Sequence, residues 1–340
     1  MDQLSPEIRA LYEKRLWHEL TEKLMTLDGT TISNIWPQIC QFSERLNQVK
    51  LVLLAIKASD WQDPSTARVF LESVQATDIQ SGLLLRIAIG SQSLKQGNIS
   101  EAAQMLETAQ KEAEVLSDLD SVLYSHLYGA LAAIHKVKNN PELFYRYSLQ
   151  YLAYTASEDV KDKENLAFQL AVAVLVSEKI YNLGELMQQP LFKSLEGSKH
   201  HWIYELLHLC DQGNVREIEA RFEGFPQELK TPELIRKVRI LAMMEYIFKN
   251  DKWQLEFGEL ANVMDVPESS IEWLLMKAMA LELIKGEIDE VNKTVRITWL
   301  QPRVLDTSRI HLIQNRLGEW KTTVNEVLKH LEDQSKELLE

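Results

Sequence analysis

The chain has 340 residues, is 45% hydrophobic and carries a formal net charge of −13 at pH 7, with a pI near 5.2. This length and apolar content predict a globular chain of about two or three domains with sizeable cores. The acidic balance disfavours a general nucleic-acid binder, because affinity for phosphate backbones requires clustered Lys and Arg.

The cysteines and the apolar runs predict the cellular location of the chain. Cys40 and Cys210 lie far apart and form neither a metal-ligand nor a redox motif, so we expect free buried thiols in a reducing compartment, the cytoplasm or the nucleus. Residues 1–6 are polar and predict no secretory signal. The longest apolar runs, 51–56 and 170–176, are too short to cross a bilayer, so no membrane partner is expected.

Residues 1–251 are predicted to form a helical-repeat region. Helical patterns fill this part, and Gly, Asn and Pro occur at its breaks. At 97–98 and again at 213–214, a glycine that ends one helix precedes an asparagine that caps the next. The small residues of 97–109 are typical of a tetratricopeptide-type hairpin. Breaks near 97, 140, 184 and 213 leave intervals of roughly 30 to 45 residues, the range of helix-pair repeats, whose usual use is protein binding.

No established catalytic motif is present, so neither enzyme activity nor a cofactor is expected. The sequence lacks the glycine-rich dinucleotide and phosphate loops, the Gly-x-Ser-x-Gly elbow and the His-Glu-x-x-His zinc motif. The best metal candidate is His201, Glu205 and His208, which lie on one helical face and have the chemistry of zinc ligands. No fourth ligand is evident nearby, and the flanking apolar residues favour ordinary helix packing.

Residues 252–304 follow the order of a winged helix. Leu255 and Phe257 flank an acid and indicate a very short strand. A helix at 259–264 follows, and Pro267 then occupies the first turn of a second helix that runs to about residue 283.

A strand hairpin completes the pattern. Val295, Ile297 and Trp299 alternate with polar residues, as in a half-buried strand, and 284–288 is the predicted partner strand. From 255 to 300 there are nine acidic and four basic residues. A winged helix with this charge is not expected to bind DNA.

Residues 305–340 are predicted to form one long helix. Asp306, Thr307 and Ser308 are good caps, and a helix that continued to Leu339 would extend roughly 45 to 50 Å. Apolar residues recur at alternating spacings of three and four, which is the narrow seam of a coiled coil or helix bundle. The seam consists of Ile310, Ile313, Leu317, Trp320, Val324, Val327 and Leu331. Packing of the seam onto the chain's own helices is the alternative.

Helical repeats, a winged helix and a terminal helix together resemble the layout of the PCI family, which supplies subunits of the proteasome lid, the signalosome and translation initiation factor complexes. The resemblance is carried by 255–261, 283–291 and 298–306, and these stretches are most similar to proteasome-lid members of the family. The stretches 11–20 and 184–190 are similar to the same members, so the resemblance spans nearly the whole chain.

The resemblance implies a non-catalytic scaffold in a hetero-oligomeric complex, with other proteasome-lid subunits as partners. It implies that an exposed strand edge at 295–299 extends the sheet of a neighbour and that the seam from Ile310 to Leu331 enters a shared helix bundle. Two alternatives remain. One is a PCI scaffold subunit of another complex, the signalosome or a translation initiation factor, with or without RNA contact. The other is a metal hydrolase built on His201, Glu205 and His208.

Overall fold

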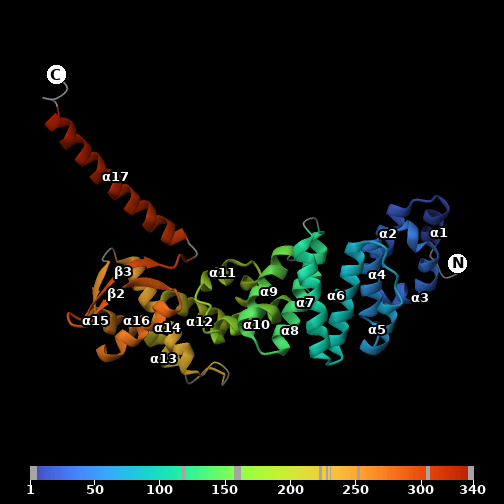
Figure 1. Ribbon diagram of the computed structural model, residues 1–340, viewed down its shortest axis with the longest axis horizontal. Helices are drawn as coiled ribbons and strands as arrows, with labels where there is room; N and C mark the ends of the chain where they lie inside the picture. The colour runs from blue at the N-terminus through green and yellow to red at the C-terminus, as the bar shows by residue number, and fades with distance from the viewer. Residues whose placement is uncertain are drawn as a thin grey trace. The chain divides into compact units, whose positions relative to one another are not determined.

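A computed structural model describes residues 6–116, 119–156, 162–221, 224–226, 229, 231–250, 253–303 and 307–335. Over these residues the chain is mostly helical, with one small sheet in its C-terminal half (Figure 1). The predicted order of helical repeats, winged helix and terminal helix is confirmed. The chain divides into two compact units, residues 1–163 and residues 164–340.

Unit 1 is a series of helices in which neighbours in the chain pack on each other, as in a solenoid of helix pairs. The closest pairs are α8 with α9, α6 with α7 and α3 with α4. A 3₁₀ segment at Cys40–Arg45 follows α3. The helices are α1 (Pro6–Glu13), α2 (Trp17–Met25), α3 (Gly29–Ile39), α4 (Gln48–Ser59), α5 (Pro64–Glu72), α6 (Ile79–Lys95), α7 (Ile99–Val115), α8 (Ser121–Val137) and α9 (Pro141–Tyr154).

The helix breaks in unit 1 lie where the sequence places them. Gly97, between α6 and α7, has φ +89°, the left-handed conformation that ends a helix at low cost in glycine. Asn140 accepts a hydrogen bond from the backbone N–H of Leu143 at 3.5 Å, as a helix cap does. Asn98 occupies the cap position of α7, but its side chain makes no capping bond, so the prediction of asparagine capping is wrong there.

Unit 2 begins with helices that pack around α14. The side chains of Met243 and Met244 on α14 are 0% and 1% exposed and belong to the core. Because α14 contacts α12 and α13 as well as α15, its core joins the last repeats to the winged helix. A 3₁₀ segment lies at Phe192–Leu195. The helices are α10 (Lys163–Val176), α11 (Leu183–Gln188), α12 (His201–Gln212), α13 (Val215–Arg221) and α14 (Pro232–Lys249).

The winged helix follows α14. Its helices α15 (Phe257–Met264) and α16 (Ile271–Ala280) pack with an antiparallel sheet ordered β1-β3-β2 (Figure 1). The second helix ends at Ala280 rather than near residue 283, because Glu282 adopts φ +57° and leaves the helical conformation. The strands are β1 (Gln254–Glu256), β2 (Ile284–Asp289) and β3 (Thr294–Leu300).

The terminal helix, α17 (Thr307–Ser335), has 29 residues and extends about 43 Å at 1.5 Å per residue. It leaves the winged helix and continues as a single long rod (Figure 1). Residues 336–340, which the sequence predicts as its last turn, lie outside the described residues. The division of the chain at residues 251 and 304 remains a prediction.

Candidate partner-binding site

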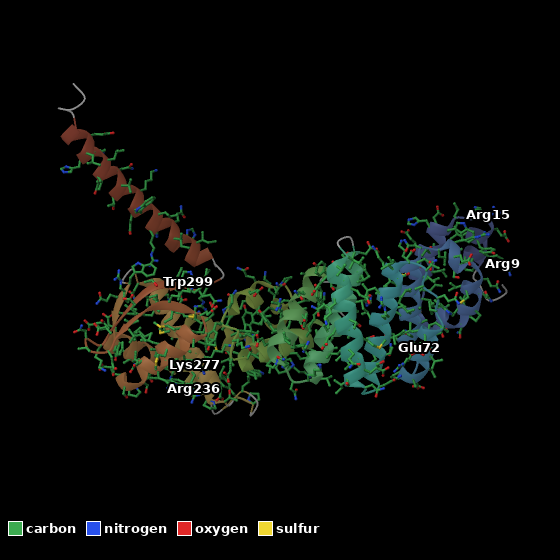
Figure 2. All side chains as sticks on the ribbon, in the orientation of Figure 1. Arg9, Arg15, Glu72, Arg236, Lys277 and Trp299 are labelled. Atoms are coloured by element: carbon green, nitrogen blue, oxygen red, sulfur yellow. The ribbon has the colours of Figure 1, made fainter. Side chains whose placement is uncertain are left out.

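The predicted seam of α17 is a row of water-exposed apolar side chains. Ile310, Leu317, Trp320, Val324, Val327 and Leu331 are between 45% and 67% exposed. Ile313 is half-buried, because it faces the body of unit 2 near the start of the helix. In Figure 2 the side chains of α17 stand out from the ribbon along its length.

An apolar row of this length is unfavourable in water. Burying one large apolar side chain stabilises a protein by about 1.5 to 3 kcal/mol. Burial of the seam against a partner would therefore contribute a stabilisation that the single chain lacks. Contiguous exposed apolar surface of this kind marks protein interaction sites. The alternative that the seam packs onto the chain's own helices is wrong for Leu317 and the exposed seam residues beyond it.

Arg316 fixes the first turns of α17. Its Nη2 atom donates hydrogen bonds to the carbonyl oxygens of Phe248 at 3.0 Å and Lys249 at 3.1 Å. These carbonyls lie at the end of α14, where the helix leaves them without partners inside the helix. The guanidinium also lies over the Phe248 ring, 5.9 Å from its centre. Arg316 therefore caps one helix while it anchors another.

Arg303 fixes the segment that leads into α17. Its side chain is 7% exposed and forms ion pairs with Asp211 of α12 and with Glu245 of α14, the latter at 2.9 Å. The two carboxylates are 14% and 10% exposed. A buried arginine between two carboxylates is stable only while all three groups stay paired. The network therefore holds the chain between β3 and α17 against the repeat helices.

The sheet places its predicted interface residues differently from the expectation. β3 is the central strand, so the exposed edge expected at 295–299 is wrong. Val295 and Ile297 are buried beneath the helices, with 0% and 1% exposure. Trp299, labelled in Figure 2, is 38% exposed, and the Nζ atom of Lys285 lies 5.1 Å from its ring centre.

The outer edge of the sheet next to the wing belongs to β2. β2 pairs with β3 on one side, and among the described strands none pairs with its other side. The sequence pattern indicated the wrong edge strand, because β1 has only three residues and gives a weak signal. β1 nevertheless pairs with β3 at Val295, and this pairing places β3 in the middle of the sheet. An unpaired edge is a template for a further strand.

The metal candidate does not form a metal site. On α12, the Nε2 atom of His201 lies 3.5 Å from the Oε1 atom of Glu205. Glu205 also accepts a hydrogen bond from Arg221 at 3.1 Å. The ring of His208 lies edge-on against Tyr204, 4.7 Å between centres. Within the described part of the chain, no group of three or more His, Cys, Asp or Glu side chains is placed to hold a metal ion.

Lys237 of α14 carries a buried amino group that no sequence pattern predicted. It is 3% exposed and donates hydrogen bonds to the carbonyl oxygens of Val174 at 2.5 Å and Ser177 at 2.7 Å, which cap the end of α10. Burial lowers the pKa of Lys237 to about 7 and raises the pKa of the nearby Cys210 thiol to about 12. Lys237 therefore serves the packing of unit 2 and lies apart from the seam.

Sequence comparison defines the class of protein. Residues 215–299 match the PCI domain, which contains the winged helix described above. Residues 5–207 match the family model described as PSD13 N-terminal repeats, and this match covers more than half of the chain. The chain is therefore a PCI protein with an N-terminal helical-repeat region.

The curated relatives define the family. The chain is 30% identical to the 26S proteasome non-ATPase regulatory subunit 13 of Dictyostelium discoideum, over 99% of this chain and 94% of the relative. It is 30% identical to the homolog A of that subunit in Arabidopsis thaliana, over 97% and 93% of the two chains. It is 28% identical to the probable 26S proteasome regulatory subunit rpn9 of Schizosaccharomyces pombe, over 92% and 87%. The chain belongs to the family of 26S proteasome non-ATPase regulatory subunit 13.

Among the helices that the structure describes, none combines the length and the apolar character needed to cross a bilayer.

Proposed function

We propose that the protein is a non-catalytic scaffold subunit of the proteasome regulatory-particle lid, where it supports assembly of the complex that degrades ubiquitinated proteins. Membership of the family supports a place in the proteasome regulatory particle, because the relatives are named as proteasome regulatory subunits. The name non-ATPase in the relatives supports a role without catalysis. The observation that carries the scaffold role is the exposed apolar seam on α17.

The seam is proposed to bind helices of neighbouring lid subunits. Leu317 and Trp320 lie at its centre, and a helix packed along it would bury them as interface anchors. Arg303 and Arg316 would hold the start of α17 while the rest of the helix joins the partners. Val295 and Ile297 would act indirectly, as core residues that support the strand carrying Trp299.

The β2 edge is proposed to bind a strand of a neighbouring subunit. Main-chain hydrogen bonds across such an edge provide affinity with little demand on sequence. The backbone N–H of Ile297 donates a hydrogen bond to the carbonyl oxygen of Trp253, on the β1 side of β3. Because backbone groups alternate in direction along a strand, those of residues 294 and 296 point to the other side, toward β2. Their partners, 289 and 287, therefore point toward β3, and the backbone of Ile288 points outward.

The proposal divides the chain into three parts with different roles. Residues 1–251 would provide a helical-repeat surface, 252–304 the sheet edge, and 305–340 the bundle helix. The proposed locations are the cytoplasm and the nucleus, in agreement with two cysteines that lie far apart and form no disulfide within the described residues. The prediction of a buried thiol is wrong for Cys40, which is exposed, whereas Cys210 is buried.

Purification of the affinity-tagged full chain, followed by quantitative mass spectrometry, tests this function. Recovery of the proteasome regulatory subunits in fixed ratios to the chain is expected. Recovery of ribosomal complexes instead, with RNA that dissociates at raised salt, would replace the proposal with the RNA-contacting alternative.

A further inference from the structure

A groove of about 440 Å³ lies where α17 meets the winged helix. The end of α14, the segment before β1, the end of β3 and the second turn of α17 all line it. The apolar part of its lining consists chiefly of Ile247, Phe248, Trp253, Trp299, Leu300 and Ile313.

The groove offers apolar surface to a ligand. The two arginines in its lining already make contacts within the protein: Arg303 with Asp211 and Glu245, and Arg316 with the carbonyls that end α14. Trp253 is 59% exposed although its neighbours are large apolar residues. An occupant that displaced the water from this surface would gain the free energy of apolar burial. An uncharged apolar side chain fits this lining, and a charged ligand does not.

The groove continues the seam of α17. Ile313 belongs to both, and Leu317 follows it four residues later on the same face of the helix. A partner helix that covered Leu317 and Ile313 would therefore arrive at the mouth of the groove.

We propose that the groove receives a large apolar side chain from the same partner helix that packs on the α17 seam, so that the partner is held both along its length and at one end. This inference rests on the proposed function, because the partner is the lid subunit that binds the seam. The groove then sets how far the partner helix extends toward the sheet, which fixes its position along α17.

Photo-crosslinking in the assembled complex tests this inference. A photoreactive amino acid replaces Trp253 in the groove, Trp320 in the seam or, as a control, Val69, which is 67% exposed on α5. Crosslinks from positions 253 and 320 to one helix of one neighbouring subunit, with none to that helix from position 69, are expected. Crosslinks to that helix from position 320 but not from 253, or from 253 only to the chain itself, would overturn the inference and leave the proposed function intact. Absence of crosslinks to lid subunits from both positions would overturn both.

A competition experiment measures the contribution of the groove. Variant and unchanged full-length chains are mixed, and their ratio in assembled complexes is compared with their ratio in the mixture. Trp253→Ala is expected to be incorporated at least tenfold less than the unchanged chain, as for an interface anchor. Trp273→Ala is the matched control, because Trp273 is 47% exposed on α16 and does not line the groove. Equal incorporation of both variants would contradict the inference.

Discussion

Arg303 holds the segment that leads into α17 against the helices of unit 2. Its guanidinium is 7% exposed between the carboxylates of Asp211 and Glu245, which come from two different helices. Arg303→Ala would remove the buried cation that the two carboxylates share, and Lys249, which lies 3.4 Å from Glu245, would remain close to one of them. We expect unit 2 to lose about 3 to 5 kcal/mol of unfolding free energy, measured by urea denaturation followed by circular dichroism.

Arg296→Ala is the control for this change. Arg296 is exposed on β3 and carries the same charge, so its loss is expected to alter stability by less than about 0.5 kcal/mol. A similar small effect for Arg303→Ala would mean that the buried ion pairs do not hold the segment.

Lys237 predicts how stability changes with pH. Its pKa is about 7 in the folded chain against an ordinary value of 10.5, so the unfolded chain binds more protons between these values. The unfolding free energy should therefore rise from pH 7 to about pH 8.5, by at most about 1.4 kcal/mol per pH unit from this group. Above that range Cys210 acts in the opposite direction, because its thiol keeps its proton longer in the folded chain, with a pKa of about 12.

The measurement compares the unchanged chain with Lys237→Met across this range. The difference in unfolding free energy between the two should shift in favour of the unchanged chain as the pH rises, because the variant has no proton to release at this position. A pH-independent difference would show that Lys237 stays charged when buried.

At the scale of single elements, α17 carries the binding surface. Leu317→Asp places a charge in the middle of the seam and should weaken assembly by a few kcal/mol, the effect of losing a buried anchor. Thr322→Asp introduces the same residue on the opposite face, where the Thr322 hydroxyl donates to the Gly318 carbonyl of its own helix. Competitive incorporation into complexes should fall for the first variant and stay unchanged for the second. Equal losses would indicate that charge on α17, rather than the seam, limits assembly.

The edge of β2 is the second element with a proposed partner. Ile288→Pro removes an N–H that points away from β3, so the β2–β3 pairing should persist while an added strand loses one hydrogen bond. We expect weaker incorporation with a nearly unchanged melting temperature. A large fall in melting temperature would show that this N–H is needed inside the subunit.

The regular elements could be predicted from sequence because their patterns are local. Gly97 ends α6 by its own conformation, and the heptad row of α17 is visible without its partners. The central position of β3 could not be predicted, because it depends on pairing with a three-residue strand. The contacts of Arg303 and Arg316 could not be predicted for a related reason, because their partners are distant in sequence. Arg303 binds Asp211, 92 residues away in the chain, and Arg316 binds Phe248, 68 residues away.

At the scale of the whole molecule, the residues that form the cores differ from those proposed to bind partners. The cores of the repeats and of the winged helix are closed by residues such as Met243 and Ile297, which are buried within the chain. The seam beyond Ile313 contributes little to these cores and stays exposed. A chain built in this way is expected to fold alone and to bury its terminal helix only in a complex.

Removal of α17 tests this account most directly. A tagged chain that ends at residue 309 keeps Arg303 and loses the seam beyond it. We predict that its repeats and winged helix still unfold cooperatively by circular dichroism, at a temperature lowered only by the loss of the Arg316 contacts to the end of α14. Mass spectrometry should find it absent from complexes containing proteasome regulatory subunits. Recovery of the truncated chain in those complexes at the level of the full chain would contradict the central claim that α17 joins the protein to its partners.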